Sequence, residues 1–381
     1  MEGGPSFMSS VFIVDTAVVT SLGSGVDSLF QRLLDSETAI SPVKRFETRR
    51  YTSQYAALIP WLEKNNEKSL IFKLTDLLLD QMGEIDKETF LLTASTKAGI
   101  DLLEKENSYK DGLPKDILPS SLSAYISRRM GLAHGGININ SACASSTIAV
   151  AKAADIIRSG RVHSVLVCCM DIVTEFVFSG FSALTAMSDR PCAPFDRKRN
   201  GLTLGEGAAA ILLMNKSRMS LEKRSPLAEI SGWGIANDAV HLTAPAKDSR
   251  GLKMAIKKAL KSAGIPPEKI GAVSAHGTGT IYNDLMEIKV IRSLFNPKAI
   301  AANSIKGAIG HTLGAAGGIE IALCAKMLEQ KILPGTKGLA EPEAGAEKIF
   351  SPEAMPILNG CILTINSGFG GANAAVIIKR T

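Results

Sequence analysis

The sequence predicts an α/β fold in which helices cover the faces of the sheets. Short apolar runs typical of buried strands alternate with longer helical patterns rich in small residues, and 45% of the 381 residues are hydrophobic. The strand-like runs are residues 11–14, 90–93, 164–169, 208–213, 362–366 and 374–378. The helical patterns cover residues 25–34, 120–130, 145–159, 251–263 and 315–329.

Two halves are predicted. A polar, charged stretch at 215–226 separates two strand-like runs and is the best candidate for a seam between them. Residues 137–157 and 299–327 also form a weak internal repeat, since each passes from a short strand through Asn-Ser into a small-residue segment and then a helix. We therefore expect one half at 9–220, carrying a nucleophile, and a second at 221–381, carrying two histidines.

The charge balance argues against an electrostatic nucleic-acid binder, because 43 basic and 37 acidic residues leave a net charge of only +6. No window approaches a membrane span, and no basic segment precedes the apolar run at 11–14, which Asp15 interrupts. We expect no signal peptide, no membrane contact and a cytoplasmic protein. The six cysteines lack metal-ligand spacing and are expected to be free thiols.

Cys143 is the first candidate for chemistry. It lies between an apolar strand at 137–139 and a helix expected to begin near Ala144. The positive end of a helix dipole and its unpaired N–H groups favour a thiolate, so we expect a lowered thiol pKa and a nucleophilic sulfur. Taken alone, a cysteine before a helix is more often a small buried residue.

Two histidines follow strand-like runs and lie in glycine-rich turns. His276 ends the run 272–275 and enters Gly-Thr-Gly-Thr, and His311 closes the segment Lys-Gly-Ala-Ile-Gly-His that begins at Lys306. Glu320 lies in the helix that comes next. Active-site groups gather at the carboxyl ends of strands, and glycines let the backbone approach a ligand. Packing in an apolar core does not readily explain two histidines and a lysine in glycine-rich turns. A single histidine in such a turn is explained equally well by a role in the structure of the turn.

The segment 366–373 is the last candidate and reads Asn-Ser-Gly-Phe-Gly-Gly-Ala-Asn between two apolar strands. The N–H groups of such a turn, which includes Ser367, Gly368 and Phe369, could face an oxyanion. An ordinary glycine hairpin is the competing interpretation.

Together these segments resemble the β-ketoacyl-acyl carrier protein synthases of the thiolase superfamily, in particular the elongating Cys-His-His group. The resemblance extends in family order from about residue 11 to the C-terminus, and it includes the segments 194–201, 205–207, 238–245 and 283–287. It implies a duplicated thiolase-like fold of five αβαβα layers and a homodimer. A thiolase would place a second cysteine in the C-terminal half, and a starter-type synthase would carry Asn in place of His311.

The resemblance also implies the chemistry. Cys143 would take an acyl chain from a thioester while its own N–H and that of Phe369 stabilise the oxyanion. A malonyl thioester would then lose CO2, and His276 and His311 would donate hydrogen bonds to the enolate oxygen. No organic cofactor and no metal are needed.

Two further residues complete the implied site. Lys306 and Glu320 would form a buried pair, with Glu320 as structural support and Lys306 counted among the catalytic groups. The expected function is decarboxylative Claisen condensation with malonyl-acyl carrier protein in fatty-acid elongation. The alternatives are a polyketide or aryl-polyene ketosynthase and a non-catalytic ketosynthase partner subunit.

The chain departs from the family in the last loop. Elongating synthases usually carry Asn-Ser-Phe-Gly-Phe-Gly-Gly there, with the first Phe as a gate, whereas here one residue is missing or Ser367 stands in the gate position. The segment 93–97, which is commonly glycine-rich in the family, reads Thr-Ala-Ser-Thr-Lys. Both departures keep the polyketide alternative open.

The implied partner is an acidic acyl carrier protein, steered by basic side chains near the mouth of the site, although a coenzyme A thioester is also compatible. The candidate docking residues are Lys44, Arg45, Arg49, Arg50, Arg128, Arg129 and Arg199.

Overall fold

The structure, a computed structural model, describes residues 10–62, 68–104 and 115–381. Its main sheet is built from β1 (Val11–Thr20), β2 (Gly23–Ser24), β5 (Phe90–Ala94), β6 (Ile137–Asn138), β7 (Ser164–Asp171), β9 (Gly207–Asn215), β10 (Ala228–Asn237), β11 (Ile270–Ser274), β12 (Ala301–Asn303), β15 (Cys361–Gly368) and β16 (Ala372–Lys379). The spatial order is β12-β11-β15-β16-β10-β1-β9-β7-β5-β6, with β2 paired to β1.

Two small sheets join β3 (Ser41–Pro42), β4 (Tyr55–Ala57) and β8 (Leu204–Gly205), and β13 (Ile332–Leu333) with β14 (Met355–Pro356). The helices are α1 (Val26–Leu34), α2 (Leu70–Leu79), α3 (Pro119–Arg129), α4 (Ser145–Arg158), α5 (Glu175–Ala183), α6 (Lys216–Leu221), α7 (Arg250–Ala263), α8 (Ile281–Leu294), α9 (Lys306–Ile309) and α10 (Ala316–Gln330).

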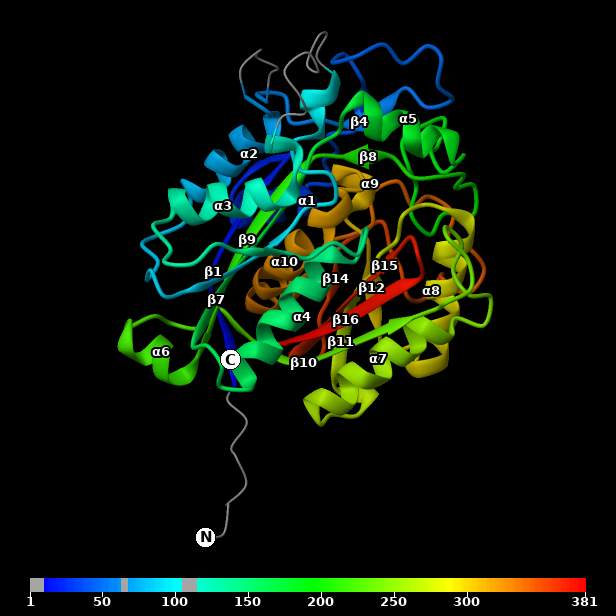
Figure 1. The fold of residues 1–381 in the computed structure, drawn as a ribbon. Coiled ribbons are helices and arrows are strands. Elements are labelled where there is room, and N and C mark those ends of the chain that lie inside the picture. Colours follow the sequence, from blue (N-terminus) through cyan, green and yellow to red (C-terminus); the bar gives the residue numbers. More distant parts are fainter. Residues whose placement is uncertain (1–9, 63–67, 105–114) are drawn as a thin grey trace.

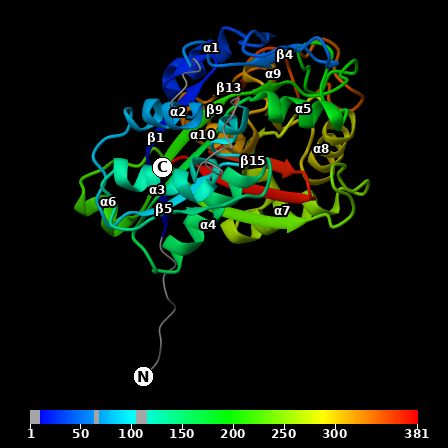
Figure 2. The same cartoon turned by 45° about the horizontal axis from the view of Figure 1, so that its top comes forward.

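The elements form five layers, as predicted (Figures 1 and 2). Helices α2 and α3 cover the outer face of the strands around β1, β5 and β9, and α7 covers the outer face of β10 and β16. Helices α4 and α10 contact each other and fill the layer between, where α4 reaches both β7 and β16, and α10 reaches both β9 and β15.

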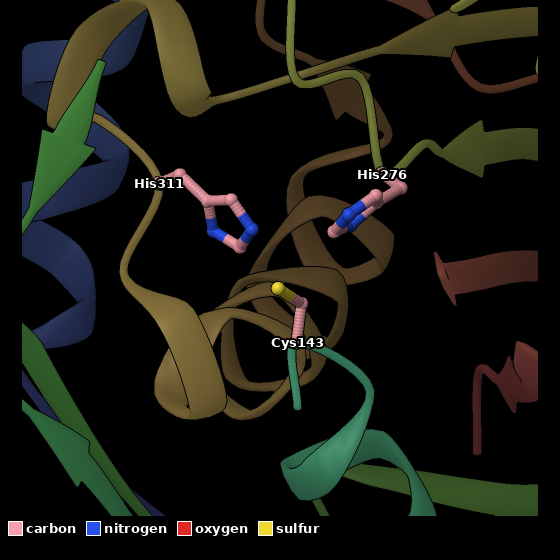
Figure 3. A group of neighbouring side chains, drawn as sticks. All are labelled: Cys143, His276 and His311. Carbon is pink, nitrogen blue, oxygen red and sulfur yellow. The ribbon is translucent and has the colours of Figure 1, made fainter. Parts of the chain in front are cut away.

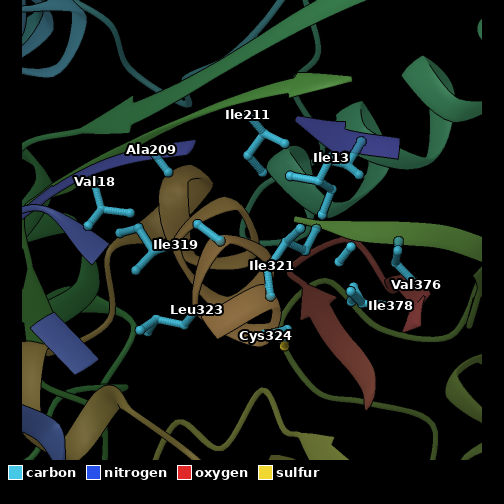
Figure 4. Packing of buried hydrophobic residues seen from close by; sticks show 14 of the residues in the cluster. Ile13, Val18, Ala209, Ile211, Ile319, Ile321, Leu323, Cys324, Val376 and Ile378 are labelled. Carbon is cyan, nitrogen blue, oxygen red and sulfur yellow. The ribbon is translucent and has the colours of Figure 1, made fainter. Parts of the chain in front are cut away.

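Strand β1 shows why the apolar runs are continuous. Ile13 and Val18 belong to the central core around α10 (Figure 4). Val11 belongs to the same core. Val14 and Val19 belong instead to the outer core against α2. Because a strand alternates its side chains between two faces and both faces are covered here, β1 is apolar on both faces except around Asp15 and Thr16, which are only partly buried beside an irregularity in the pairing with β9.

The predicted strands and helices all form, with ends that differ by a few residues. The predicted seam at 215–226 contains the short helix α6. The strand before this segment, β9, and the strand after it, β10, both hydrogen-bond to β1. The division of the chain at residue 220 stays a prediction.

Two glycines of β10 allow α7 to lie unusually close to the sheet. A Cβ at Gly232 would lie 2.4 Å from the carbonyl oxygen of Ala259, and one at Gly234 would lie 2.1 Å from that of Ala255. Both distances are shorter than any van der Waals contact, so only glycine fits.

No helix in the described part of the chain combines the length and the apolar character that crossing a membrane requires.

Candidate active site

Cys143 is presented by a tight turn at the start of α4. Ala142 has a φ of 48°, a left-handed conformation that costs energy for a residue with a Cβ. The Ser145 hydroxyl closes the turn by accepting from the Ser141 N–H at 2.8 Å and donating to the Ala142 carbonyl at 2.5 Å. A Cβ at Gly368 would lie 2.7 Å from the Ser141 carbonyl oxygen, so glycine is needed beside this turn.

Cys143, His276 and His311 meet at the bottom of a pocket. One ligand atom from each lies within 4.8 Å of the others, and the sulfur lies between the two rings (Figure 3). The ring centroids are 5.2 Å apart and the ring planes are nearly perpendicular, at 85°. All three side chains are buried, yet they line a cavity of about 640 Å³ that opens to the surface beside α8. The cavity can admit a slender substrate to the sulfur.

His311 is a neutral hydrogen-bond donor toward this cavity. Burial, and then the charge of Lys306, lower its pKa well below 6.5, so the ring is uncharged at neutral pH. The N–H of Leu313 donates to Nδ1 at 3.2 Å. Because a neutral imidazole carries one proton, that proton sits on Nε2, on the side away from Leu313.

His276 is set in the same state by a side chain. Burial, followed by the charge of Lys306 and by repulsion from a protonated His311, lowers its pKa well below 6.5. Its Nδ1 lies 3.2 Å from Nδ2 of Asn366. The same Asn366 amide donates to the Glu320 carboxylate at 2.8 Å, and its oxygen accepts from Thr147, which fixes the amide orientation. His276 therefore also carries its proton on Nε2.

The predicted contact between Lys306 and Glu320 is present. Their charged atoms lie 2.6 Å apart, and both side chains are 1% exposed. Burial raises the pKa of Glu320, while Lys306 opposes that rise. A chain of contacts thus runs from Lys306 through Glu320 and Asn366 to His276. The part that the pair takes in a reaction stays a prediction.

The expected lowering of the Cys143 pKa is wrong. Burial raises the thiol pKa to about 11, and the opposing effects of Lys306 and of a hydrogen bond from the Phe369 N–H are smaller. Asp171 adds to the rise. Desolvation penalises the thiolate more than the helix start and the nearby lysine favour it, so the resting form is the thiol.

The last loop lies against Cys143. Ser367 and Gly368 end β15, and the turn itself is Phe369 to Gly371, where Gly370 and Gly371 have φ values of 86° and 83°. The Ser367 hydroxyl donates to Asn373 at 2.7 Å. The Phe369 ring stacks on Phe181 of α5, with centroids 5.7 Å apart. Both aromatic rings line the cavity.

The tautomers of the histidines disfavour a metal at this cluster. Cys143, His276 and His311 are the group in the described residues whose ligand atoms lie close enough to hold one ion. Coordination through Nε2 would require the proton on Nδ1, and each Nδ1 instead accepts a hydrogen bond. The donor set suits an anionic oxygen better than a cation.

Sequence reasoning missed the supporting roles of Glu287 and Asn366. Glu287 accepts from the N–H groups of His276 and Gly277 at 2.7 Å each, and so fixes the turn that carries the histidine. Burial, and then Asp284, raise the Glu287 pKa to about 8. The sequence does contain a signal that could have identified Asn366, because this polar residue ends the apolar strand run at 362–366.

Two predicted docking residues are wrong. Arg45 is largely buried and pairs with the fully buried Glu206. Arg199 is 1% exposed and bonds to Glu343 at 2.8 Å. Side chains held inside in this way cannot meet a partner. Of the others, Arg129 pairs with Asp80 and Arg50 with Glu175, and none of the seven lines the cavity.

Comparison with known proteins places the chain in one family. Residues 81–219 match the β-ketoacyl synthase N-terminal domain and residues 227–340 match the C-terminal domain, together well over half of the chain. A curated relative, 3-oxoacyl-[acyl-carrier-protein] synthase 2 of Coxiella burnetii, is 27% identical over 97% of this chain and 98% of its own length.

Solved structures agree with the fold. The ishigamide ketosynthase/chain length factor is similar with a TM-score of 0.89 and 25% identity, over 98% of this chain and 100% of that one. The ketosynthase ApeO in complex with its chain length factor ApeC, from Xenorhabdus doucetiae, is similar with a TM-score of 0.83 and 25% identity over the whole of both chains. With the five-layered fold and both family domains present, the chain belongs to the β-ketoacyl synthase family and is an enzyme of the acyltransferase class.

Proposed function

We propose that the protein catalyses decarboxylative Claisen condensation of a Cys143-bound acyl chain with malonyl-acyl carrier protein. The observation that carries the proposal is the convergence of two neutral Nε2–H donors, from His276 and His311, on the space above the Cys143 sulfur. Paired neutral donors suit an enolate oxygen, because they stabilise negative charge without surrendering a proton to it.

In the loading step the Cys143 sulfur attacks the carbonyl of an acyl thioester. The Phe369 N–H, which lies near enough to the sulfur to oppose the rise of its pKa, and the Cys143 N–H are the proposed oxyanion donors. The carbon–sulfur bond to the carrier breaks, and the thiol proton of Cys143 passes to the departing thiolate. Both histidines already carry a proton on Nε2 and cannot accept another one there. The departing thiolate is therefore the group that accepts the thiol proton.

In the condensation step the malonyl thioester loses CO2, and the electron pair of the broken carbon–carbon bond forms an enolate. His276 and His311 hold the enolate oxygen, and its carbon attacks the Cys143 thioester. Collapse expels the Cys143 sulfur as a thiolate, which takes one proton from solvent water to return to the thiol, so each condensation consumes one proton and releases one CO2. Lys306 acts through Glu320 and Asn366 on His276. The substrate carries its own leaving group, so the proposed cycle needs no organic cofactor or metal.

Fatty-acid elongation is the first choice of pathway, supported by the name of the Coxiella burnetii relative. A polyketide or aryl-polyene ketosynthase is the second candidate. Ser367 is small where the family usually has a gate Phe, and two similar solved structures are ketosynthase and chain length factor assemblies. Cys143 argues against a non-catalytic partner subunit. We also propose an acyl carrier protein as the substrate donor, a homodimer and a cytoplasmic location.

The test is mass spectrometry of the intact protein after incubation with an acyl-carrier thioester. The wild type should gain the mass of one acyl group, and Cys143→Ala should gain none while keeping its circular dichroism spectrum. Addition of malonyl-carrier thioester should discharge the acyl group as a β-ketoacyl product. An adduct on Cys143→Ala, or an adduct that malonyl thioester never discharges, would refute the proposal.

A further inference from the structure

The mouth of the active-site cavity carries an exposed apolar surface. Val240 and Leu242 lie in the loop before α7, and Ile281, Tyr282 and Leu285 lie on the first turns of α8. Leu242 is 79% exposed and Tyr282 is 71% exposed. The loop and the helix both line the cavity, through His241, Thr243, Ile281 and Tyr282 among others. Large side chains this exposed around one opening indicate a binding surface.

Basic residues flank these apolar side chains. The Lys289 ammonium, on α8, donates to the Lys247 carbonyl at 3.0 Å and so joins the helix to the loop. Neither lysine has a carboxylate within 4.0 Å among the residues that the structure describes. The acidic residues of α8, Asp284 and Glu287, are fully buried. Asp248, next to Lys247 in the loop, is exposed but pairs with Arg250 at 2.9 Å. The surface is therefore apolar with two cations that have no carboxylate partner there, and we name these seven residues the rim patch: Val240, Leu242, Lys247, Ile281, Tyr282, Leu285 and Lys289.

The position of the rim patch limits what can occupy it. Cys143 lies at the bottom of the cavity and is 6% exposed, so a substrate must reach it on a slender arm while a larger body stays outside. A membrane surface or a second copy of the chain would cover the opening without supplying such an arm. An acidic protein that carries its acyl group on a flexible thioester arm meets all three requirements. Its charge complements the lysines, its apolar side chains can cover the exposed apolar residues, and its arm can reach Cys143.

We propose that the rim patch is the docking surface for the acidic carrier protein, whose apolar helix face packs on Tyr282 and Leu285 while its carboxylates meet Lys247 and Lys289. This rests on the proposed function, and it places docking on α8 and the loop before α7 in place of the arginines expected from the sequence. Arg128 of α3 is exposed and lines no part of the cavity.

The experiment compares three variants outside the cavity lining. Lys289→Glu reverses a rim charge, Leu285→Ser removes a rim apolar contact, and Arg128→Glu is a matched charge reversal on α3. Binding of a fluorescently labelled acyl carrier protein is measured by anisotropy, and acyl loading is measured separately with an acyl N-acetylcysteamine thioester. We expect Lys289→Glu and Leu285→Ser to weaken carrier binding about five- to tenfold, with Arg128→Glu within twofold of wild type. Loading from the small thioester should stay within twofold in all three.

The contrary outcomes are distinct. Equal carrier affinity in Lys289→Glu and wild type, or a larger loss in Arg128→Glu, overturns the rim patch as the docking surface. Loss of binding to anionic phosphatidylglycerol vesicles, or a halved molecular mass in solution, with carrier affinity unchanged, overturns it in favour of a lipid or a second copy. If the wild type binds carrier at the rim patch but the small thioester never acylates Cys143, docking stands and the proposed function fails.

Discussion

A substitution at Asn366 tests directly whether this side chain fixes the tautomer of His276. Its amide donates to Nδ1 of His276 at 3.2 Å and to Glu320 at 2.8 Å. In Asn366→Asp a carboxylate would face both groups, so the ring is expected to move its proton to Nδ1 and turn a lone pair toward the cavity. One of the two proposed enolate donors is then lost. Loss of a single donor of this type costs about 3 kcal/mol of barrier, or on the order of a hundredfold in rate.

The assay separates the two half-reactions. Decarboxylation of a malonyl thioester should fall about a hundredfold in Asn366→Asp. Acyl loading, for which Cys143 and Phe369 are the proposed groups, should fall less than tenfold. The ¹⁵N chemical shifts of His276 should change from the Nε2–H to the Nδ1–H pattern. Asn366→Ala, which removes the donor without adding charge, controls for the cost of a buried carboxylate. Equal losses in loading and decarboxylation, or an unchanged His276 tautomer, would refute this reasoning.

Four further results are expected. His311→Ala should block condensation far more than loading, measured by single-turnover acylation and product release; equal losses would mean that the ring chiefly activates the thiol. Ser367→Phe should slow loading of bulky acyl groups about ten- to hundredfold, since an added ring costs about 1–3 kcal/mol of fit, with short chains less affected in a graded-length assay; equal slowing would sink the gate interpretation. Lys306→Met should lower the free energy of unfolding by about 3–5 kcal/mol because Glu320 is left unpaired, and adding Glu320→Leu should restore most of it in urea titrations. Burial lowers the pKa of His276 and His311 below 6.5, so the unfolded chain binds protons that the folded chain refuses; stability is full above pH 6.5 and should fall below it by up to about 1.4 kcal/mol per pH unit per histidine, and a double Gln variant that keeps the wild-type slope would contradict this.

Local patterns predicted the elements well, because both faces of strands such as β1 and β9 are buried and their residues are almost uniformly apolar. Cys143 and both histidines stood out as polar or reactive residues where strands end. Strand β10 was harder to predict because Gly232 and Gly234 have low strand propensity. They are needed there because a larger residue would clash with α7.

What escaped prediction depends on contacts between distant segments. Asn366 bonds to Thr147, 219 positions away, and Glu287 matters through backbone groups of another loop. The thiol pKa was predicted in the wrong direction, because a helix start is visible in sequence and the depth of burial is not. The same reason accounts for Arg45, whose partner Glu206 lies 161 positions away.

Strand β1 has a consequence for how substrates enter. It hydrogen-bonds to β9 along one edge and to β10 along the other, so the strands on its two sides share one continuous ladder. Cys143 starts the helix that follows β6, at one end of that ladder, and His276 follows β11 near the other. A movement that pulled β10 away from β1 would have to break the main-chain pairing at Val11 to Ile13. We therefore expect access to the sulfur to depend on side chains and loops at the cavity mouth, such as Phe181 and Phe369, and not on separation of the strands that β1 joins.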